Sequence, residues 1–295
     1  MVAWNNLRKL SSIAVGTGAG LAVYYYQRLR EPSNLVQNSW TNSDKPVSEA
    51  AIWDPDWDCR DPKSCVHPLK NDTPQEQNRF NSELEKMRVK ATRHIVLVRH
   101  GQYLDVGVHD KDHHLTELGR LQAKYTGQRL HELGIKWDKI IVSTMTRAQE
   151  TSEMILKEID YDLEKVKHCH YLREGAPIAP QPPVGHWRPE KSQFFRDGAR
   201  IEAAFRRYFH RAYPEQEHDS YTLIIAHANV IRYFVCRALQ IPPEAWLRMN
   251  INHGSITWLT ISPSGNVCIK HLGESGYMPA NCLSNRIPRE VKNVV

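Results

Sequence analysis

The chain alternates short apolar runs with longer amphipathic stretches from residue 94 onward. The first run lies in "HIVLVRHGQY" (His94–Tyr103), where the aliphatic residues Ile95–Val98 are too few for a core helix and are typical of a buried strand. The runs Ile140–Val142 and Tyr221–Ala226 have the same character. The pattern therefore predicts three buried strands, each followed by a polar tip.

Helical periodicity follows each of these strands. "LTELGRLQAKYTGQRLHELG" predicts a helix that is capped by Thr116 and stopped by Gly134. A second helix is expected after Ser143 and a third after His227. Strands that alternate with helices are typical of a mostly parallel sheet with helices on both faces, so we expect an α/β three-layer sandwich.

The segment before the first strand, residues 31–89, is polar and rich in Asn, Asp, Ser and Pro, which is typical of a linker. Within it, Thr73 and Glu76 have the spacing of a capping box, and Pro74 suits the first helical position. A helix over about residues 74–90 is therefore expected to lead into the first strand.

A second feature of this linker is the motif "WDPDWD". It consists of Trp53, Asp54, Pro55, Asp56, Trp57 and Asp58. Exposed tryptophan is costly in a pure linker, so the motif is expected to dock on a folded surface. That surface is either the chain's own domain or a neighbouring subunit.

The amino-terminal segment Leu10–Tyr26, "LSSIAVGTGAGLAVYYY", has no charged residue in its seventeen positions. This length is near the lower limit for spanning a bilayer, and tyrosines at its end suit the membrane interface. It therefore predicts a membrane anchor, and its basic flanks also fit an uncleaved mitochondrial targeting anchor. The alternative is a cleaved secretory signal, although no A-x-A-like cleavage site follows the apolar run.

The formal net charge of +6 is concentrated at the amino terminus. Arg8, Lys9, Arg28 and Arg30 contribute four of these charges before the first acid, Glu31, which leaves +2 for the rest of the chain. Such a balance argues against a nucleic-acid partner, which requires a basic face on the folded domain. Six cysteines without a CxxC motif indicate reduced thiols and argue against a secreted disulfide protein. They are Cys59, Cys65, Cys169, Cys236, Cys268 and Cys282.

Polar residues follow the three predicted strands where simple turns would be expected. They are Arg99 and His100 after the first, Ser143 to Arg147 after the second, and His227 after the third. Parallel strands end at one edge of an α/β sheet, where ligands bind, so these side chains should converge. Two arginines and two histidines beside helix N-termini favour a phosphoryl group. Histidine can attack phosphorus or transfer protons.

Four motifs, in order, carry a family resemblance: "VRHGQ", "LTELGRLQA", "STMTRAQET" and "AHANVIRY". The chain resembles the histidine phosphatase (phosphoglycerate mutase-like) superfamily. From about Trp53, "WDPDWD", "LREGAP", "DGARIEAAFR" and "HANVIRYFVCRALQIPPEAWLRM" extend the resemblance to the mitochondrial serine/threonine protein phosphatases within it. The resemblance implies a phosphoglycerate mutase-like fold and a hydrolase that needs no metal and no cofactor.

The resemblance also implies a role for each site residue. His100 is the expected nucleophile, which forms a covalent phosphohistidine that water hydrolyses. Arg99 and Arg147 would hold the phosphoryl oxygens, with His227 as a further donor to the phosphate. Glu174, in "LREGAP", would protonate the leaving oxygen and then activate water.

Several segments depart from the mutase pattern or invite another interpretation. A mutase would show an "ERHYG"-like segment after its acidic residue, whereas this chain has "EGAPIAP". The proline-rich stretch Ala176–Trp187 is expected at the rim of an open pocket, which suits a phosphorylated side chain on a protein. "HCH" (His168–His170) is read as part of a strand because no third metal ligand lies nearby. The arginines of "RDGARIEAAFRRYFHRA" are expected in solvent, with substrate docking as the alternative. They are Arg200, Arg206, Arg207 and Arg211.

Together with the anchor and the site residues, the resemblance implies a phosphoserine and phosphothreonine protein phosphatase on a mitochondrial membrane, which assembles into a homo-oligomer through residues 53–58. The alternatives are a mutase or small-molecule phosphatase of the same fold, and an assembly scaffold with a silent pocket. The expected domain organisation has four parts: an anchor over 1–30, a linker over 31–89, a catalytic domain over 90–280 and a tail over 281–295.

Overall fold

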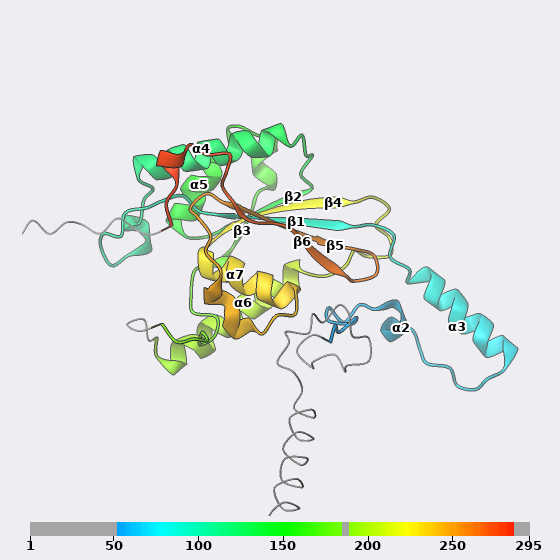
Figure 1. The fold of residues 1–295 in the computed structure, drawn as a ribbon. Helices are drawn as coiled ribbons and strands as arrows, with labels where there is room; N and C mark the ends of the chain where they lie inside the picture. Colours follow the sequence, from blue (N-terminus) through cyan, green and yellow to red (C-terminus); the bar gives the residue numbers. More distant parts are fainter. Residues whose placement is uncertain (1–51, 185–188, 286–295) are drawn as a thin grey trace, which may run out of the picture. The chain divides into compact units, whose positions relative to one another are not determined.

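A computed structural model describes residues 52–184 and 189–285, all within one structural unit (Figure 1). The expected anchor at 10–26 lies outside the described residues. Within the described ranges, no helix combines the length and the apolar character needed to cross a membrane.

A six-stranded sheet forms the centre of the domain, with the strand order β3-β2-β4-β1-β5-β6. Its strands are β1 (Arg93–Arg99), β2 (Lys139–Ser143), β3 (Lys167–Cys169), β4 (Ser220–Ala226), β5 (Ile256–Ile261) and β6 (Val267–Glu274). The four strands from β3 to β1 run parallel to one another, whereas β5 pairs antiparallel with both β1 and β6. The three strands predicted from apolar runs are confirmed as β1, β2 and β4.

The expectation of a mostly parallel sheet is wrong, because the sheet is mixed. The strands β5 and β6 form a hairpin around the turn 262–266, where the N–H of Gly265 donates to the carbonyl of Ser262. A hairpin needs only a tight turn and no crossover helix, so these two strands add to the sheet antiparallel. The sequence analysis does not predict these two strands, because polar residues interrupt their apolar positions.

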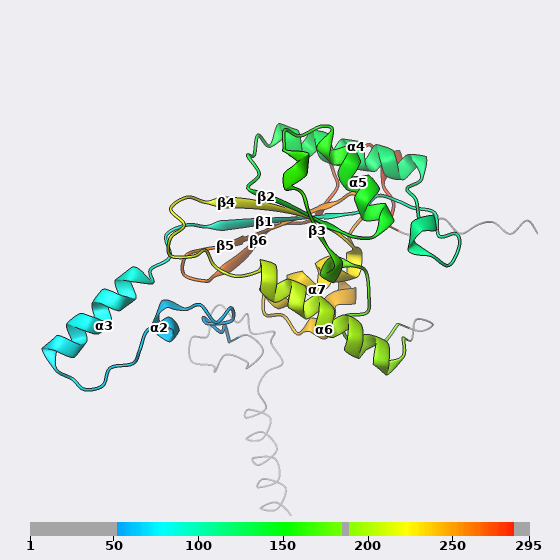
Figure 2. The same cartoon turned by 180° about the vertical axis from the view of Figure 1, so that it is seen from behind.

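Helices cover both faces of the sheet, α4 and α5 one face and α6 and α7 the other (Figures 1 and 2). The helices are α2 (Pro62–Cys65), α3 (Pro74–Lys86), α4 (Glu117–Glu132), α5 (Thr146–Leu156), α6 (Lys191–Tyr208) and α7 (Ala228–Ala238). The 3-10 helices are η2 (Asp110–Asp112), η3 (Leu163–Lys165), η4 (His170–Leu172), η5 (Pro243–Arg248) and η6 (Ala280–Cys282). The three-layer α/β architecture is thus confirmed.

The side chains of β1 alternate between two hydrophobic cores. Ile95 and Leu97 belong to the core under α6 and α7, whereas Val96 and Val98 belong to the core under α4 and α5. All four are fully buried. Each such burial contributes about 1.5–3 kcal/mol to folding, so the central strand is held firmly and its carboxyl end is fixed in place.

The ends of α4 follow the sequence signals. The Thr116 hydroxyl accepts a hydrogen bond from the N–H of Gly119, and Gly134 has φ +62°, a left-handed conformation that favours glycine after a helix. Both predictions are confirmed.

The capping box predicted for α3 is wrong, although the helix itself is present. Thr73 makes no capping bond, and its hydroxyl donates to Asn71 instead. The carboxylate of Glu76 pairs with Arg79 one turn later. Pro74 at the first position is sufficient to start the helix.

Candidate active site

His100 follows β1 directly and is almost completely buried. Its Nδ1 lies 2.8 Å from the carbonyl oxygen of Gly101. Because a carbonyl only accepts, Nδ1 carries the ring proton and Nε2 keeps its lone pair. Burial and the neighbouring Arg147 guanidinium hold the pKa of His100 well below its usual range, so the ring is neutral and nucleophilic at pH 7.

Arg147 lies in the first turn of α5, with its guanidinium beside the reactive nitrogen of His100. Its Nε donates to His100 Nε2 at 3.2 Å, and its guanidinium carbon stands 4.6 Å from the centre of the Tyr103 ring. The Tyr103 ring in turn lies edge-on to His100. Arg147 therefore lies where it would meet a phosphoryl group attacked by His100.

His227 stands immediately before α7, and its ring centre lies 5.1 Å from that of His100. Its Nε2 is 2.7 Å from the Ser143 hydroxyl, and that hydroxyl accepts from the N–H of Met145. The hydroxyl proton can therefore point to Nε2, which places the ring proton of His227 on Nδ1. Nδ1 is buried and has no partner among the described residues, so it is a free donor.

Glu174 lies in the loop after η4, and its carboxylate faces the amino end of α7. Oε1 accepts from the N–H of Gly175 at 3.1 Å, and Oε2 accepts a longer bond from the N–H of Asn229. Burial raises the pKa of the Glu174 carboxyl, against the opposing pull of Arg147. A carboxyl that holds its proton to higher pH suits a general acid.

Arg99 ends β1 and is positioned by residues that sequence reasoning missed. Its Nη2 donates to His253 Nε2 at 2.9 Å, and its Nη1 donates to the carbonyls of Ile251 and Asn285. His253 Nδ1 lies 2.9 Å from the Ser284 hydroxyl. Burial and the adjacent Arg99 lower the pKa of His253 to about 3, so this ring stays neutral and accepts from the guanidinium.

Asp110 on η2 connects the loop after β1 with the site, and the sequence analysis did not predict this role. Its Oδ2 accepts from the N–H of Thr146 at the start of α5. Its carboxylate pairs with Arg147 at 3.6 Å and with Arg173 at 3.7 Å. Asp110 thus offsets part of the positive charge of Arg147 and Arg173.

The arginines expected in solvent behave differently from one another. Arg211 is 1 % exposed and Arg200 is half-buried, so the expectation of solvation is wrong for both. Arg200 donates to the carbonyls of Tyr171, Arg173 and Glu174, and thereby holds the loop that carries the Glu174 carboxylate. Arg206 pairs with Glu202 on the surface of α6, and Arg207 is exposed.

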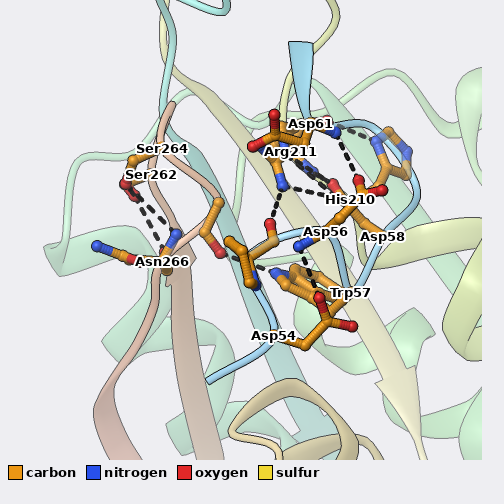
Figure 3. A network of polar contacts seen from close by, with 12 residues as sticks. Asp54, Asp56, Trp57, Asp58, Asp61, His210, Arg211, Ser262, Ser264 and Asn266 are labelled. Atoms are coloured by element: carbon orange, nitrogen blue, oxygen red, sulfur yellow. Dashed lines mark hydrogen bonds and ion pairs between the residues drawn. The ribbon is translucent and has the colours of Figure 1, made fainter. Parts of the chain in front are cut away.

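The segment Trp53–Asp58 lies against its own domain in the structure (Figure 3). The indole N–H of Trp57 donates to the carbonyl of Gly265 in the β5–β6 turn, and its ring packs beside Phe205. Asp54 exchanges two hydrogen bonds with the side chain of Gln240. In the structure the motif therefore docks on its own domain, which is one of the two expected surfaces.

A buried ion pair anchors this segment. The guanidinium of Arg211 contacts both carboxylate oxygens of Asp58, with 2.9 Å from Nη2 to Oδ1, and Asp58 is 0 % exposed (Figure 3). Arg211 also donates to the carbonyl of Pro55 and lies 3.5 Å from Asp61. An ion pair with this many hydrogen bonds tolerates burial, and it fixes the register of the docked segment.

The structure brings together all five expected site residues, namely Arg99, His100, Arg147, Glu174 and His227. Of the residues that the sequence analysis missed, His253 had a weak signal. In "INHGS" a histidine and a glycine stand just before the apolar run of β5. Of the stretch "HCH" expected in a strand, His168 lies in β3, whereas His170 is the first residue of η4. The donors Nδ1 of His227 and Nε of Arg99 are both buried without partners in the described chain, so the site is prepared for a tetrahedral anion.

Comparisons with known proteins agree with this geometry. The sequence profile of the histidine phosphatase superfamily (branch 1) matches residues 95–176 and 179–272. A Drosophila virilis protein named serine/threonine-protein phosphatase Pgam5, mitochondrial, is 72% identical over 289 residues, which cover 98% of this chain and 100% of that protein. The protein of the same name from Drosophila melanogaster is 70% identical over 289 residues, with the same coverage of both chains.

Among solved structures, the phosphoglycerate mutase of Plasmodium falciparum is 34% identical, with a TM-score of 0.44 over 62% of this chain and 92% of that one. The family profile covers more than half of the chain, and the two Drosophila relatives match it almost from end to end. The chain belongs to the histidine phosphatase superfamily, branch 1.

Proposed function

We propose that the protein is a phosphoprotein phosphatase that acts through a phosphohistidine at His100. The observation that carries this proposal is the pair of unpartnered buried donors, Arg99 Nε and His227 Nδ1, beside a neutral imidazole whose Nε2 lone pair accepts from Arg147 Nε until that guanidinium turns to the phosphoryl group. Unpaired buried N–H groups are costly, and phosphoryl oxygens would satisfy both of them.

In the first step, the Nε2 lone pair of His100 attacks phosphorus and forms an N–P bond. The P–O bond to the substrate breaks, and its electron pair stays on the leaving oxygen, which takes the proton of the Glu174 carboxyl. Arg147 turns from Nε2 to the phosphoryl oxygens and, with Arg99 and His227, stabilises the charge of the transition state.

In the second step, water attacks the phosphohistidine. The Glu174 carboxylate, now deprotonated, takes a proton from the water, so that an oxygen–phosphorus bond forms as the N–P bond breaks. The electron pair returns to Nε2 of His100, and inorganic phosphate leaves. The bond from Nδ1–H to the Gly101 carbonyl holds the ring in one tautomer throughout.

The substrate class follows from the names of the relatives and from the loop after Glu174. Both Drosophila relatives are named serine/threonine-protein phosphatases, so phosphoserine and phosphothreonine on proteins are the proposed substrates. After Glu174 the chain runs to η5, where the carbonyl of Ile178 accepts from Trp246 and the N–H of Gln181 donates to Glu244. These two bonds fasten the loop to η5, and "EGAPIAP" stands where a mutase would carry an "ERHYG"-like segment, which disfavours the mutase alternative.

The cellular setting is also proposed from the relatives and the sequence. Their names say mitochondrial, and an uncharged segment at 10–26 with basic flanks supports an anchor in a mitochondrial membrane. The proposed organisation is an anchor over 1–30, a linker over 31–89, a catalytic domain over 90–280 and a tail over 281–295, whose Ser284 and Asn285 contact the catalytic site. Exchange of the docked segment 53–58 between chains would keep every one of its contacts and give a homo-oligomer.

The proposed activity is tested by phosphate release from phosphoserine, phosphothreonine and phosphotyrosine peptides and from 3-phosphoglycerate, with the full chain. The change His100→Ala should reduce peptide turnover by at least about a thousandfold, because it removes the nucleophile. His218→Ala, an exposed histidine away from the site, is the matched control and should leave turnover unchanged.

A radiolabelled phosphopeptide should transfer an acid-labile, alkali-stable phosphoryl group to the unmodified chain and none to the His100→Ala chain. Preference for phosphoglycerate over every peptide would replace the proposal with the mutase or small-molecule alternative. If no substrate is turned over while the chain still assembles, the scaffold alternative is correct.

A further inference from the structure

A second cationic cavity lies at the opposite ends of the strands from His100. It has a volume of about 460 Å³ and opens between the amino ends of the strands and the last turn of α6. We name it the basic pocket, defined by Arg93, Lys139, Lys167, His168, Arg207 and His210. Among the described residues that line it there is no aspartate or glutamate.

The sheet register brings three of these cations to one face. Arg93, Lys139 and Lys167 are the first residues of β1, β2 and β3. Each stands two positions before a residue of the core under α6 and α7, and alternate residues of a strand share a face. All three cations therefore belong to the face that α6 and α7 cover, at the edge where the apolar core ends.

These cations have no acidic partner. No ion pair within the described ranges involves Arg93, Lys139, Lys167 or Arg207. Arg93 Nη1 donates to the carbonyls of Tyr208 and His210. These bonds explain why an arginine lies at the end of α6, but they do not explain why two lysines lie beside it.

The nearest acids are engaged elsewhere. Asp138 accepts from the N–H of Tyr221, Glu217 pairs with Lys90, and Asp219 accepts from the N–H of Thr92. These three line the adjoining cavity, which shares part of its lining with the basic pocket, and none of them forms an ion pair with a cation of the basic pocket. The positive charge of the basic pocket is thus unpaired within the described residues.

The pKa of His210, a buried side chain beside Arg93, also indicates a positive potential in the basic pocket. Burial and the charge of Arg93 lower the pKa of His210 to about 4, so its ring is neutral at pH 7. His210 Nδ1 donates to the carbonyl of Arg211, which keeps the ring in place. Burial disfavours a charge of either sign, and the contribution of Arg93 adds a positive local potential, which favours an anion.

We propose that the basic pocket binds a small anion with two or more linked phosphoryl groups, such as the polyphosphate chain of a nucleoside triphosphate. Its cavity lies within the range of small-molecule sites, about 300–1,000 Å³. The lysine ammonium groups and the Arg207 guanidinium supply charge-assisted donors for several oxygens at once. The site is separate from the catalytic one, because β1 spans about 20 Å between Arg93 and Arg99.

The test is isothermal titration calorimetry of inorganic tripolyphosphate and of ATP into the full chain carrying Arg147→Ala, which weakens the catalytic phosphoryl site. We expect both ligands to bind the Arg147→Ala chain saturably at the basic pocket. Adding Lys139→Gln and Lys167→Gln should weaken it about tenfold at low salt, as expected when two charge contacts are each worth a factor of a few. Higher salt should weaken it as well.

Lys124→Gln with Lys157→Gln is the matched control, because both lysines are exposed on the α4 and α5 side of the sheet. This pair should leave the affinity unchanged. Equal loss in the control pair and the pocket pair, or no saturable binding at all, would overturn the proposal. Similar affinity for ATP and tripolyphosphate would assign recognition to the phosphates alone, whereas tighter ATP binding would include the nucleoside.

A second measurement does not depend on the lysine variants. A bound polyanion stabilises the protonated ring of His210, so the pKa of His210, followed by NMR, should rise when tripolyphosphate is added to the Arg147→Ala chain. An unchanged titration of His210 at saturating tripolyphosphate would refute binding in the basic pocket. Neither measurement requires turnover, so this proposal and the proposed phosphatase activity can fail independently.

Discussion

One backbone carbonyl decides which nitrogen of His100 reacts. The Gly101 oxygen takes the Nδ1 proton, and Nε2 is left to face Arg147. Gly101 itself has no room for a side chain, because an added Cβ would stand 2.4 Å from the carbonyl oxygen of Gly119. The motif "RHG" is therefore explained atom by atom: the arginine and histidine carry the chemistry, and the glycine lets α4 pack against them.

The role of Glu174 can be isolated by the choice of leaving group. Glu174→Gln should lower turnover of a phosphoserine peptide by about 100- to 10,000-fold, because a serine alkoxide needs a proton to leave. The first step on p-nitrophenyl phosphate should be affected far less, since nitrophenolate leaves without one. Because burial raises the pKa of this carboxyl, peptide turnover by the unmodified chain should fall as rising pH removes that proton.

Stopped-flow release of nitrophenolate and a pH profile for both substrates give the measurement. If Glu174→Gln slows the nitrophenolate burst as much as peptide turnover, Glu174 does not act as the acid.

His253 is predicted to position Arg99. His253→Leu removes the acceptor for Arg99 Nη2, and the guanidinium should then move, which lowers kcat/KM by about 10- to 100-fold. His253→Gln keeps an acceptor at this place and should recover much of that loss. The dissociation constant of tungstate, a phosphate analogue, should follow the same order.

Both variants should lower the thermal midpoint, so stability alone does not separate the two roles. Equal kcat/KM and equal tungstate affinity in the leucine and glutamine variants would show that His253 only fills space.

At the scale of elements, apolar runs and helix signals foretold the part of the fold that forms the site. The strands β1, β2 and β4 and the helices that follow them were predicted because a buried parallel strand is continuously apolar. The hairpin β5–β6 was missed because β6, "VCIKHLGE", has only half-buried and exposed positions and therefore lacks a continuous apolar run. No local pattern indicates that a hairpin will extend a parallel sheet.

Contacts between distant segments explain what the sequence could not predict within the site. His253 and Arg99 are 154 residues apart, and Arg211 and Asp58 are 153 apart. Neither pair lies on a shared periodic pattern, so each is visible only once the sheet has brought the segments together. Arg211 appeared to continue the polar face of α6, yet α6 ends at Tyr208 and the chain turns it inward.

The docked segment 53–58 is the element through which assembly is predicted. Trp57→Ala removes the indole bond to Gly265 and the packing on Phe205, while the Arg211–Asp58 pair remains. The chain should therefore stay folded, with lower oligomer mass by light scattering and lower turnover.

Phe195→Ala is the control, since this ring is 83% exposed on α6 and its loss should leave both mass and turnover as they are. An unchanged mass for the Trp57→Ala chain would remove the assembly proposal.

For the whole molecule, five buried histidines predict sensitivity to mild acid. The folded structure lowers the pKa of each of them, to about 4 for His210 and about 3 for His253, well below the usual range for His100 and His227, and below it for His94 as well. The unfolded chain binds protons near pH 6.5, so stability is complete above that pH and falls as pH drops. Each histidine costs about 1.4 kcal/mol per pH unit between its two pKa values.

Urea unfolding at pH 7.5, 6 and 5 measures this effect. The free energy of unfolding should decrease from pH 6.5 downward, and His253→Gln should reduce the slope by about one proton. A free energy that is constant down to pH 5 would show that these rings are protonated without loss of the fold.

The carboxyl-terminal stretch reaches back into the site, since the Asn285 carbonyl and the Ser284 hydroxyl meet Arg99 and His253. Arg99 is therefore fully held only after residues 284 and 285 have folded into place, so the phosphoryl site is among the last parts of the domain to form during synthesis. Proteolytic trimming after Leu283 would weaken the grip on the phosphoryl group without touching the nucleophile. For the laboratory, the same feature means that an affinity tag is safer at the amino end of the catalytic domain than at its carboxyl end.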